Sequence, residues 1–153
     1  MNALSRPVIL VVDADPLSLT ATAAVLHCSE YEVHCAASRE AALKGARSLE
    51  LDLVICDLDI GGVDGGSILD EIRQIPQRSD VPVMYASPCQ VPEVIRRNHV
   101  QGAVYHLRKP FDPKVLLELV ETALWMPHLV RTHVRQPHFR LDASPIQPNA
   151  AVQ

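Results

Sequence analysis

Short, uninterrupted apolar runs are the feature that most constrains how this chain can fold. Two of them, Val8-Ile9-Leu10-Val11-Val12 and Leu53-Val54-Ile55-Cys56, contain no polar residue apart from the thiol. A strand with one face in water alternates polar and apolar residues, whereas a strand covered on both faces is apolar throughout. Such strands are typical of parallel sheets, because the crossover helices pack on both faces. The two runs therefore predict central strands of a parallel sheet.

Three further strand candidates, at residues 31–35, 83–86 and 103–107, alternate with segments that carry helix signals. A proline or a capping residue marks the start of several of these segments. The first expected helix begins at Pro16 and has Leu17, Ala21, Ala24 and Val25 as apolar positions, and the second runs over 39–49 after a Ser38 cap. The third carries Ile68, Leu69, Ile72 and Ile75 and ends at Pro76. The fourth runs over 92–99, and the last begins at Pro113 after an Asp112 cap.

The order of these segments is (βα)₅, which indicates an α/β fold. Alternation of strand and helix favours a parallel sheet with right-handed crossovers and helices on both faces. Five strands are too few for an eight-stranded barrel. We therefore expect a flavodoxin-like open sheet with the strand order 2-1-3-4-5.

Composition narrows the class of protein. The net charge of −4 argues against direct nucleic-acid binding, which needs a basic face. No apolar run approaches the roughly 20 residues of a membrane-spanning helix, so we expect no membrane insertion and a cytoplasmic location. The expected domain covers residues 1–126. Residues 127–153 contain four prolines without apolar periodicity, and we expect a tail there and no output domain.

Polar side chains follow several of the expected strands at the point where each strand ends. Asp13 follows the first strand, Asp57 the third and Ser87 the fourth, and Lys109 comes after the fifth. The carboxyl ends of parallel strands share one sheet edge, where ligands bind. Carboxylates are ligands for Mg²⁺ and can act as nucleophiles toward phosphorus, while an amine can neutralise phosphoryl oxygens. The pattern favours phosphoryl chemistry at that edge.

In order and spacing, the chain resembles the response-regulator receiver domains of two-component signalling over residues 8–125. The resemblance is carried by five pieces: Val8-Ile9-Leu10-Val11-Val12-Asp13-Ala14-Asp15-Pro16, Leu51-Asp52-Leu53-Val54-Ile55-Cys56-Asp57-Leu58, Val63-Asp64-Gly65-Gly66, Val81-Pro82-Val83-Met84-Tyr85-Ala86-Ser87, and Gly102-Ala103 with Leu107-Arg108-Lys109-Pro110-Phe111. Each piece alone is moderately specific, and together they are highly specific.

The resemblance implies a role for each strand-end residue. Asp57 is then the phosphoacceptor, supplied by a histidine kinase or a phosphotransfer protein. Asp13, Asp57 and the backbone carbonyl of Asp59 are then ligands of Mg²⁺. Ser87 binds the phosphoryl group and signals its presence, and Lys109 pairs with a phosphoryl oxygen. The resemblance also implies a cis bond between Lys109 and Pro110.

The chain departs from the family pattern at three places. Ala14 stands where a second metal-binding acid is usual, and Asp15, one residue later, is at best a weak replacement, so we expect weakened Mg²⁺ binding. The usual switch aromatic falls at His106, with Tyr105 one residue early and facing the opposite side. Gly61-Gly62 replaces a loop that usually contains proline, and we expect a more mobile loop.

Three functions remain open from the sequence. The first is a stand-alone receiver that is phosphorylated on Asp57 and switches the binding of an unidentified downstream protein, or a homodimer, through the 92–99, 103–107 and 113–125 face. The alternative is a pseudo-receiver, a protein–protein interaction module without phosphorylation. A third interpretation rests on Asp57-Leu58-Asp59, which resembles the first motif of haloacid-dehalogenase-type phosphatases, although Gly61 stands where Thr or Val is usual. We expect no enzyme activity beyond self-phosphorylation and self-dephosphorylation.

Overall fold

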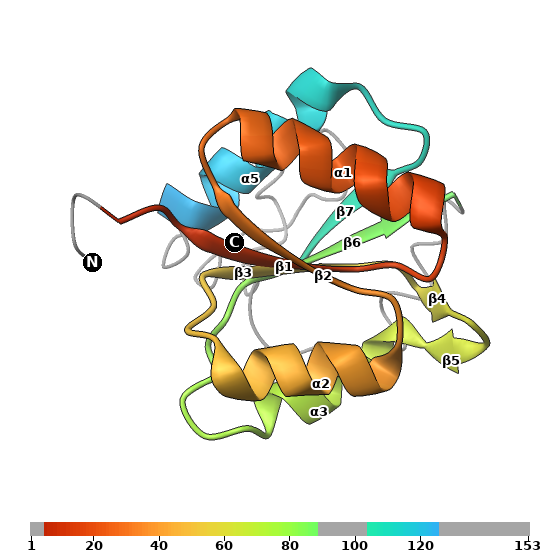
Figure 1. The fold of residues 1–153 in the computed structure, drawn as a ribbon, viewed down its shortest axis with the longest axis vertical. Helices are drawn as coiled ribbons and strands as arrows, with labels where there is room; N and C mark the ends of the chain where they lie inside the picture. Colours follow the sequence, from red (N-terminus) through yellow and green to blue (C-terminus); the bar gives the residue numbers. More distant parts are fainter. Residues whose placement is uncertain (1–4, 89–103, 126–153) are drawn as a thin grey trace, which may run out of the picture.

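A five-stranded parallel sheet runs through the middle of the molecule (Figure 1). The computed structural model describes residues 5–88 and 104–125. The strands of the sheet are β1 (Val8–Val12), β2 (Glu32–Ala36), β3 (Leu53–Cys56), β6 (Val83–Ser87) and β7 (Val104–Arg108). They lie in the order β2-β1-β3-β6-β7, and each neighbouring pair is parallel. This is the expected 2-1-3-4-5 order, so the flavodoxin-like α/β fold is confirmed.

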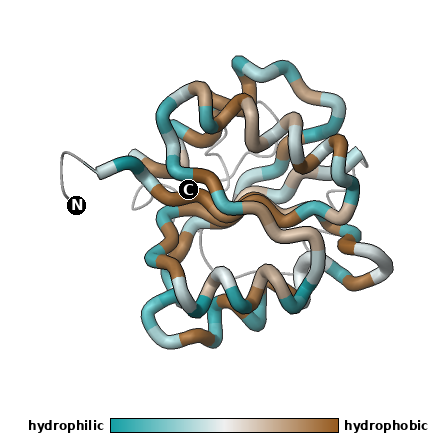
Figure 2. Tube along the Cα trace, viewed as in Figure 1, coloured by the Kyte–Doolittle hydropathy of each residue, from teal (hydrophilic) through white to brown (hydrophobic). Residues whose placement is uncertain are grey.

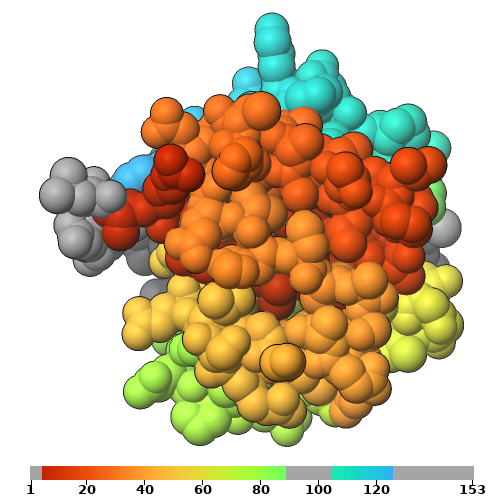
Figure 3. Space-filling model, in the orientation of Figure 1, coloured from red at the N-terminus to blue at the C-terminus, as the bar shows by residue number. Residues whose placement is uncertain are grey.

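Helices cover both faces of the sheet. Figure 1 shows α1 (Pro16–Cys28) and α5 (Pro113–Trp125) on one face, and α2 (Arg39–Ser48) and α3 (Gly65–Arg73) on the other. Residues of the first third of the chain, in red to orange, make up most of the molecular face seen in Figure 3. The helix expected over 92–99 lies outside the described residues. No helix in the described parts of the chain is both long and apolar enough to cross a membrane.

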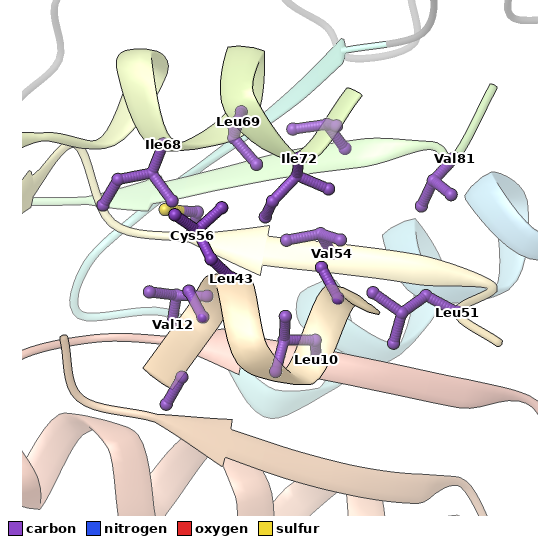
Figure 4. Packing of buried hydrophobic residues seen from close by; sticks show 14 of the residues in the cluster. Leu10, Val12, Leu43, Leu51, Val54, Cys56, Ile68, Leu69, Ile72 and Val81 are labelled. Carbon is purple, nitrogen blue, oxygen red and sulfur yellow. The ribbon is translucent and has the colours of Figure 1, made fainter. Parts of the chain in front are cut away.

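The uninterrupted apolar strands are explained by two separate cores. Successive residues of a strand point to opposite faces, so β1 sends alternate side chains to each core. Leu10 and Val12 pack with α2 and α3 (Figure 4), while Ile9 and Val11 pack with α1 and α5. Both cores need apolar partners, and Figure 2 accordingly shows the central strands as strongly hydrophobic. The prediction of central strands covered on both faces is confirmed.

The expected apolar face of α1 is wrong in part. Leu17 is 80% exposed, and Ala21 and Ala24 are exposed as well, whereas Thr22 and Leu26 are buried. Small and apolar residues of α1 occur on all sides of the helix, so the sequence pattern does not single out one buried face. The sheet instead selects Thr22 and Leu26, which lie one helical turn apart.

The third helix ends earlier than expected. It closes at Arg73 with Gln74 as its C-cap, so Ile75 lies in the following turn rather than on the helix. Pro76 disfavours helical geometry at the residue before it, which explains why the helix cannot include Ile75. Ile75 still packs against the core of α2 and α3.

A short antiparallel hairpin follows the third strand of the sheet and was not expected from the sequence. It consists of β4 (Asp59–Ile60) and β5 (Val63–Asp64), and it projects at one side of the molecule (Figure 1). Its turn residues Gly61 and Gly62 have φ values of +59° and +90°. A two-residue hairpin turn with positive φ at both positions favours glycine, which explains the Gly-Gly pair.

Candidate functional site

The carboxyl ends of the central strands bring the predicted site residues to one edge. Asp13 directly follows β1, and its N–H donates to the Ala36 carbonyl of β2 at 3.0 Å. Asp57 directly follows β3, and its N–H donates to the Val12 carbonyl at 3.0 Å. The sheet register therefore continues into both aspartates and sets their backbones side by side.

Lys109 joins the two carboxylates. Its Nζ lies 2.6 Å from Asp13 Oδ2 and 2.7 Å from Asp57 Oδ2. The side chains are largely buried, with exposed fractions of 14% for Lys109, 5% for Asp13 and 13% for Asp57. The Lys109 N–H donates to the Ser87 carbonyl at 2.8 Å, which anchors the lysine to the end of β6. The Lys109–Pro110 peptide bond is cis, as the resemblance implied.

Backbone N–H groups hold the remaining oxygens of both carboxylates. Asp13 Oδ1 accepts from the N–H of Asp15 at 2.9 Å, and Asp57 Oδ1 accepts from the N–H of Asp59 at 3.2 Å. Each carboxylate is thus fixed by a backbone donor on one oxygen and by the ammonium of Lys109 on the other. Charge-assisted hydrogen bonds of this kind are stronger than neutral ones, so they stabilise these positions of the two carboxylates.

The electrostatics of the pocket favour the ionised forms of Asp13 and Lys109. Burial by itself raises the pKa of Asp13, but hydrogen bonds from Lys109, Ser18 and the Asp15 N–H, together with the charge of Lys109, lower that pKa below its usual value. Burial likewise opposes the charge on Lys109, and the two carboxylates outweigh it and raise the pKa of the ammonium. Two carboxylates and one ammonium leave the site with one net negative charge.

The lowered pKa of Asp13 predicts a specific loss of stability in acid. A carboxylate whose pKa is lower in the folded state stabilises the fold above its unfolded pKa, and this contribution disappears as pH falls through the folded pKa. We expect the free energy of unfolding to fall below about pH 4, and to fall less steeply in Asp13→Asn. Urea unfolding at a series of pH values checks this, with Asp80→Asn as the exposed control. Equal slopes in wild type and Asp13→Asn would contradict the assignment.

The carboxylates of Asp15, the expected weak ligand, and of Asp59, expected to bind through its backbone carbonyl, are engaged in local hydrogen bonds. Asp15 is the N-cap of α1, and its Oδ1 accepts from the Leu17 N–H at 3.3 Å. The Oδ1 of Asp59 accepts from the Gly62 N–H at 2.8 Å, across the hairpin turn. Ala14 offers no side-chain oxygen. Within residues 5–88 and 104–125, no three acidic, His or Cys side chains are grouped so that they could hold a metal ion.

The donors that do converge still suit Mg²⁺ in kind. Asp13 and Asp57 supply carboxylate oxygens, and the backbone of Asp59 lies beside Asp57. Oxygen ligands are what Mg²⁺ prefers, and Mg²⁺ needs only one or two carboxylates when waters and phosphate complete its shell. The pocket therefore fits the ion in chemistry, with fewer carboxylates than the family pattern supplies.

Of the expected switch residues, Ser87 has a contact with a pocket residue, through its carbonyl and the Lys109 N–H. Ser87 ends β6 and is 2% exposed, and Tyr85 precedes it on the same face. His106 is the register partner of Tyr85, so these two side chains share that face. Tyr105 points to the opposite core, where it is 6% exposed and packs with α1 and α5. Burial raises the pKa of the Tyr105 hydroxyl.

Two further residues, to which the sequence assigned no role, support the site. Ser18 hydrogen-bonds to Asp13, and no pattern in the sequence marks it. Gly65 begins α3 next to the Asp57 backbone, where an added Cβ would lie 2.0 Å from the Asp57 carbonyl oxygen. The Asp64-Gly65-Gly66 run was a signal for this close approach, because a glycine is needed where backbones meet.

Comparison with known proteins identifies the family. The model of the response regulator receiver domain matches residues 9–121. The chain belongs to this family. Receiver domains are in general phosphoacceptor domains rather than enzymes, and they interact with histidine kinases or phosphotransfer proteins. The resemblance inferred from the sequence is thus confirmed.

Curated relatives of this receiver domain include longer regulators. The transcriptional regulatory protein ZraR of Escherichia coli K12 is 34% identical over 124 residues, which is 80% of this chain and 27% of ZraR. The probable transcriptional regulator ycf29 of Porphyra purpurea is 24% identical over 79% of this chain and 58% of its own length. The chain therefore spans between about a quarter and three fifths of these relatives.

Solved receiver structures share the fold. The chemotaxis protein CheY4 of Vibrio cholerae is 26% identical with a TM-score of 0.74, over 78% of this chain and 100% of CheY4. The receiver domain of the sensor histidine kinase PA1611 of Pseudomonas aeruginosa is 25% identical with a TM-score of 0.67, over 76% of this chain and 96% of that domain. That structure is described with a magnesium ion in its active-site cleft, and Mg²⁺ is typical of receiver domains.

Proposed function

We propose that this receiver domain accepts a phosphoryl group on Asp57 from a histidine kinase or a phosphotransfer protein. The observation that carries the proposal is the pair of contacts of Lys109 Nζ with Asp57 Oδ2 and Asp13 Oδ2. They link the acceptor carboxylate to a cation that can later neutralise phosphoryl oxygens.

The chemistry requires a nucleophile, a counter-charge and a hydrogen-bond donor. An Asp57 carboxylate oxygen attacks phosphorus, and the bond from phosphorus to the donor nitrogen breaks as the acyl phosphate forms. Lys109 pairs with a phosphoryl oxygen, and Ser87, which ends the adjacent strand, supplies a hydroxyl. Asp13, Asp57 and the Asp59 carbonyl are the residues that would hold Mg²⁺, which would neutralise charge on the transferring group.

Phosphorylation is proposed to change the affinity of the domain for a partner. Phosphorylation shifts an equilibrium between two arrangements of the same fold. The proposed partner-binding surface is the face of β7, α5 and the helix expected over 92–99. Its occupant is an unidentified downstream protein or a second copy of this chain. The net charge of −4 supports a protein partner rather than direct nucleic-acid binding.

One observation favours the second candidate, an interaction module without phosphorylation. Ala14 supplies no ligand, and Asp15 and Asp59 direct their carboxylates into a helix cap and a turn. Phosphoryl transfer depends on neutralising charge, so a poor metal site disfavours it. In that case the same face would bind its partner in one fixed state.

The two candidates are separated by phosphorylation with a small donor. The full chain is incubated with acetyl phosphate at rising Mg²⁺, and its intact mass is measured. We expect the mass of wild type to increase by one phosphoryl group. A larger fraction of Ala14→Asp molecules should carry this group, and Asp57→Asn should not be modified at all. Asp59→Asn is the matched control, and it should still be modified because its side chain only braces the hairpin turn.

The opposite results are equally clear. If neither wild type nor Ala14→Asp takes up phosphate at any Mg²⁺ concentration, the phosphoacceptor function is wrong and the interaction module remains. If the wild-type protein turns over a generic phosphomonoester and Asp59→Asn loses this activity, Asp59 acts as an acid or base, and the phosphatase interpretation replaces both.

A further inference from the structure

One edge of the sheet is formed by β2, which lies between α1 and α2 in Figure 1. Among the described strands it pairs with β1 alone, and it contains no proline or lysine. Such an edge presents unpaired N–H and C=O groups, which proline, lysine or a bulge usually protects from pairing with another chain. We propose that two copies of this chain form a homodimer in which their β2 edges pair antiparallel about Val33. This surface differs from the proposed partner-binding surface, and the dimer does not depend on phosphorylation.

The register of the sheet determines which backbone groups of β2 face away from β1. The Glu32 N–H donates to the Pro7 carbonyl at 2.9 Å, and the Ala36 carbonyl accepts from the Asp13 N–H at 3.0 Å. Even-numbered residues of the strand therefore direct their backbone groups toward β1. This direction alternates along a strand, so Val33, at the centre of the outer edge, directs its N–H and its carbonyl away from the sheet.

A two-fold axis at Val33 matches the outward backbone groups of two copies. The two Val33 residues exchange a pair of N–H to carbonyl hydrogen bonds, as in any hydrogen-bonded antiparallel pair. The Cys35 N–H of each copy then lies opposite the Tyr31 carbonyl of the other. The Tyr31 N–H already donates to the Leu26 carbonyl at 3.3 Å, so Tyr31 takes part through its carbonyl only.

The exposed side chains of β2 are complementary in this arrangement. Glu32 of one copy lies opposite His34 of the other, in a non-hydrogen-bonded pair, where side chains approach most closely. Within one copy, His34 Nε2 already lies 2.8 Å from Glu32 Oε2, and the two side chains are 37% and 52% exposed. Pairing therefore alternates imidazole and carboxylate groups around the axis, and each imidazole meets a carboxylate of either copy.

Other antiparallel registers lose this complementarity. Moving the axis by one residue places His34 opposite His34, or Glu32 opposite Glu32. Moving it by two residues places Glu32 opposite Glu30, or His34 opposite Ala36. Like charges directly opposite each other destabilise a strand pair. The edge is thus complementary to its own sequence in one register, which favours a second copy as the occupant over an arbitrary extended segment.

Sedimentation equilibrium of the full chain at rising protein concentration tests the dimer. The variants are Glu32→His, His34→Glu and the double variant that combines both changes. Either single change places like groups opposite each other across the axis, whereas the double variant restores the complementary pairs. Glu118→His is the matched control, because it makes the same exchange at an exposed position on α5. Far-UV circular dichroism shows that each variant is folded.

We expect a reversible dimer in wild type, in the double variant and in Glu118→His. Dimerisation should weaken at least about tenfold in each single variant. A mixture of Glu32→His with fluorescently labelled His34→Glu should form a heterodimer, because the opposed groups are complementary only between the two chains.

Three results would overturn the inference. The first is a wild type that stays monomeric at every concentration tested. The second is a dimer that both single variants form as tightly as wild type, which would place the contact on another surface. The third is a mixture of the two single variants that forms no heterodimer. None of these results bears on the modification of Asp57 by acetyl phosphate, so the proposed function is tested separately.

Discussion

Gly65→Ala is expected to lower the free energy of unfolding by about 3 kcal/mol and to impair phosphorylation of Asp57. The new Cβ would lie 2.0 Å from the Asp57 carbonyl oxygen and 3.1 Å from the Leu58 Cα. Both are backbone atoms, so no side chain can rotate away. The start of α3 or the acceptor strand end must move, and the Gly65 N–H bond to the Leu58 carbonyl at 2.8 Å would be strained.

Gly45→Ala is the matched control for this substitution. Its Cβ would meet the Leu10 Cδ1 atom at 3.4 Å, an ordinary contact with a flexible side chain, and alanine favours the α2 helix. Urea unfolding should therefore show no loss of stability in Gly45→Ala. A Gly65→Ala variant as stable as Gly45→Ala, with normal phosphorylation, would show that α3 does not need to approach Asp57 this closely.

Lys109→Met is expected to lower the free energy of unfolding by about 2 kcal/mol at neutral pH and in the absence of divalent ions. It leaves the carboxylates of Asp13 and Asp57 close together with no cation between them. Complete burial would make the loss larger, but the Asp57 side chain remains 13% exposed, so solvent screens part of the repulsion. Urea unfolding in a chelating buffer measures the effect.

Two further variants show whether the loss comes from charge. Lys114→Met removes an exposed lysine from the first turn of α5 and should have little effect. Combining Asp13→Asn with Lys109→Met should recover part of the stability, because only one buried carboxylate then remains. If Lys109→Met is as stable as Lys114→Met, the three groups are not electrostatically coupled.

The sequence was sufficient to predict the sheet and the place of the pocket. Val8–Val12 and Leu53–Cys56 are apolar on both faces, which only a central parallel strand requires, and the register then delivers Asp13 and Asp57 to one edge. The Lys109-Pro110 pair resembles the family motif, and this resemblance predicted that Lys109 supplies the cation of the pocket. These features were predictable because strand periodicity and chain order determine them.

Features that depend on side-chain competition were not predictable. The sequence could not show that Asp15 caps α1 or that Asp59 braces the Gly61-Gly62 turn, because an aspartate can serve a turn or a ligand equally well. Nor could it show that Lys109 bridges both carboxylates, since this requires its side chain, which follows β7, to reach past β6 to the ends of β1 and β3. The buried face of α1 was missed because alanine shows little preference for either side.

The most direct test of the central claim is to locate the phosphoryl group by tandem mass spectrometry, after the full chain has reacted with acetyl phosphate. The pocket of Asp13, Asp57 and Lys109 predicts a single modified carboxylate, that of Asp57, with Asp13 and Asp59 unmodified. A phosphoryl group found on any other residue, or on none in both wild type and Ala14→Asp, would contradict a phosphoacceptor site at this edge of the sheet.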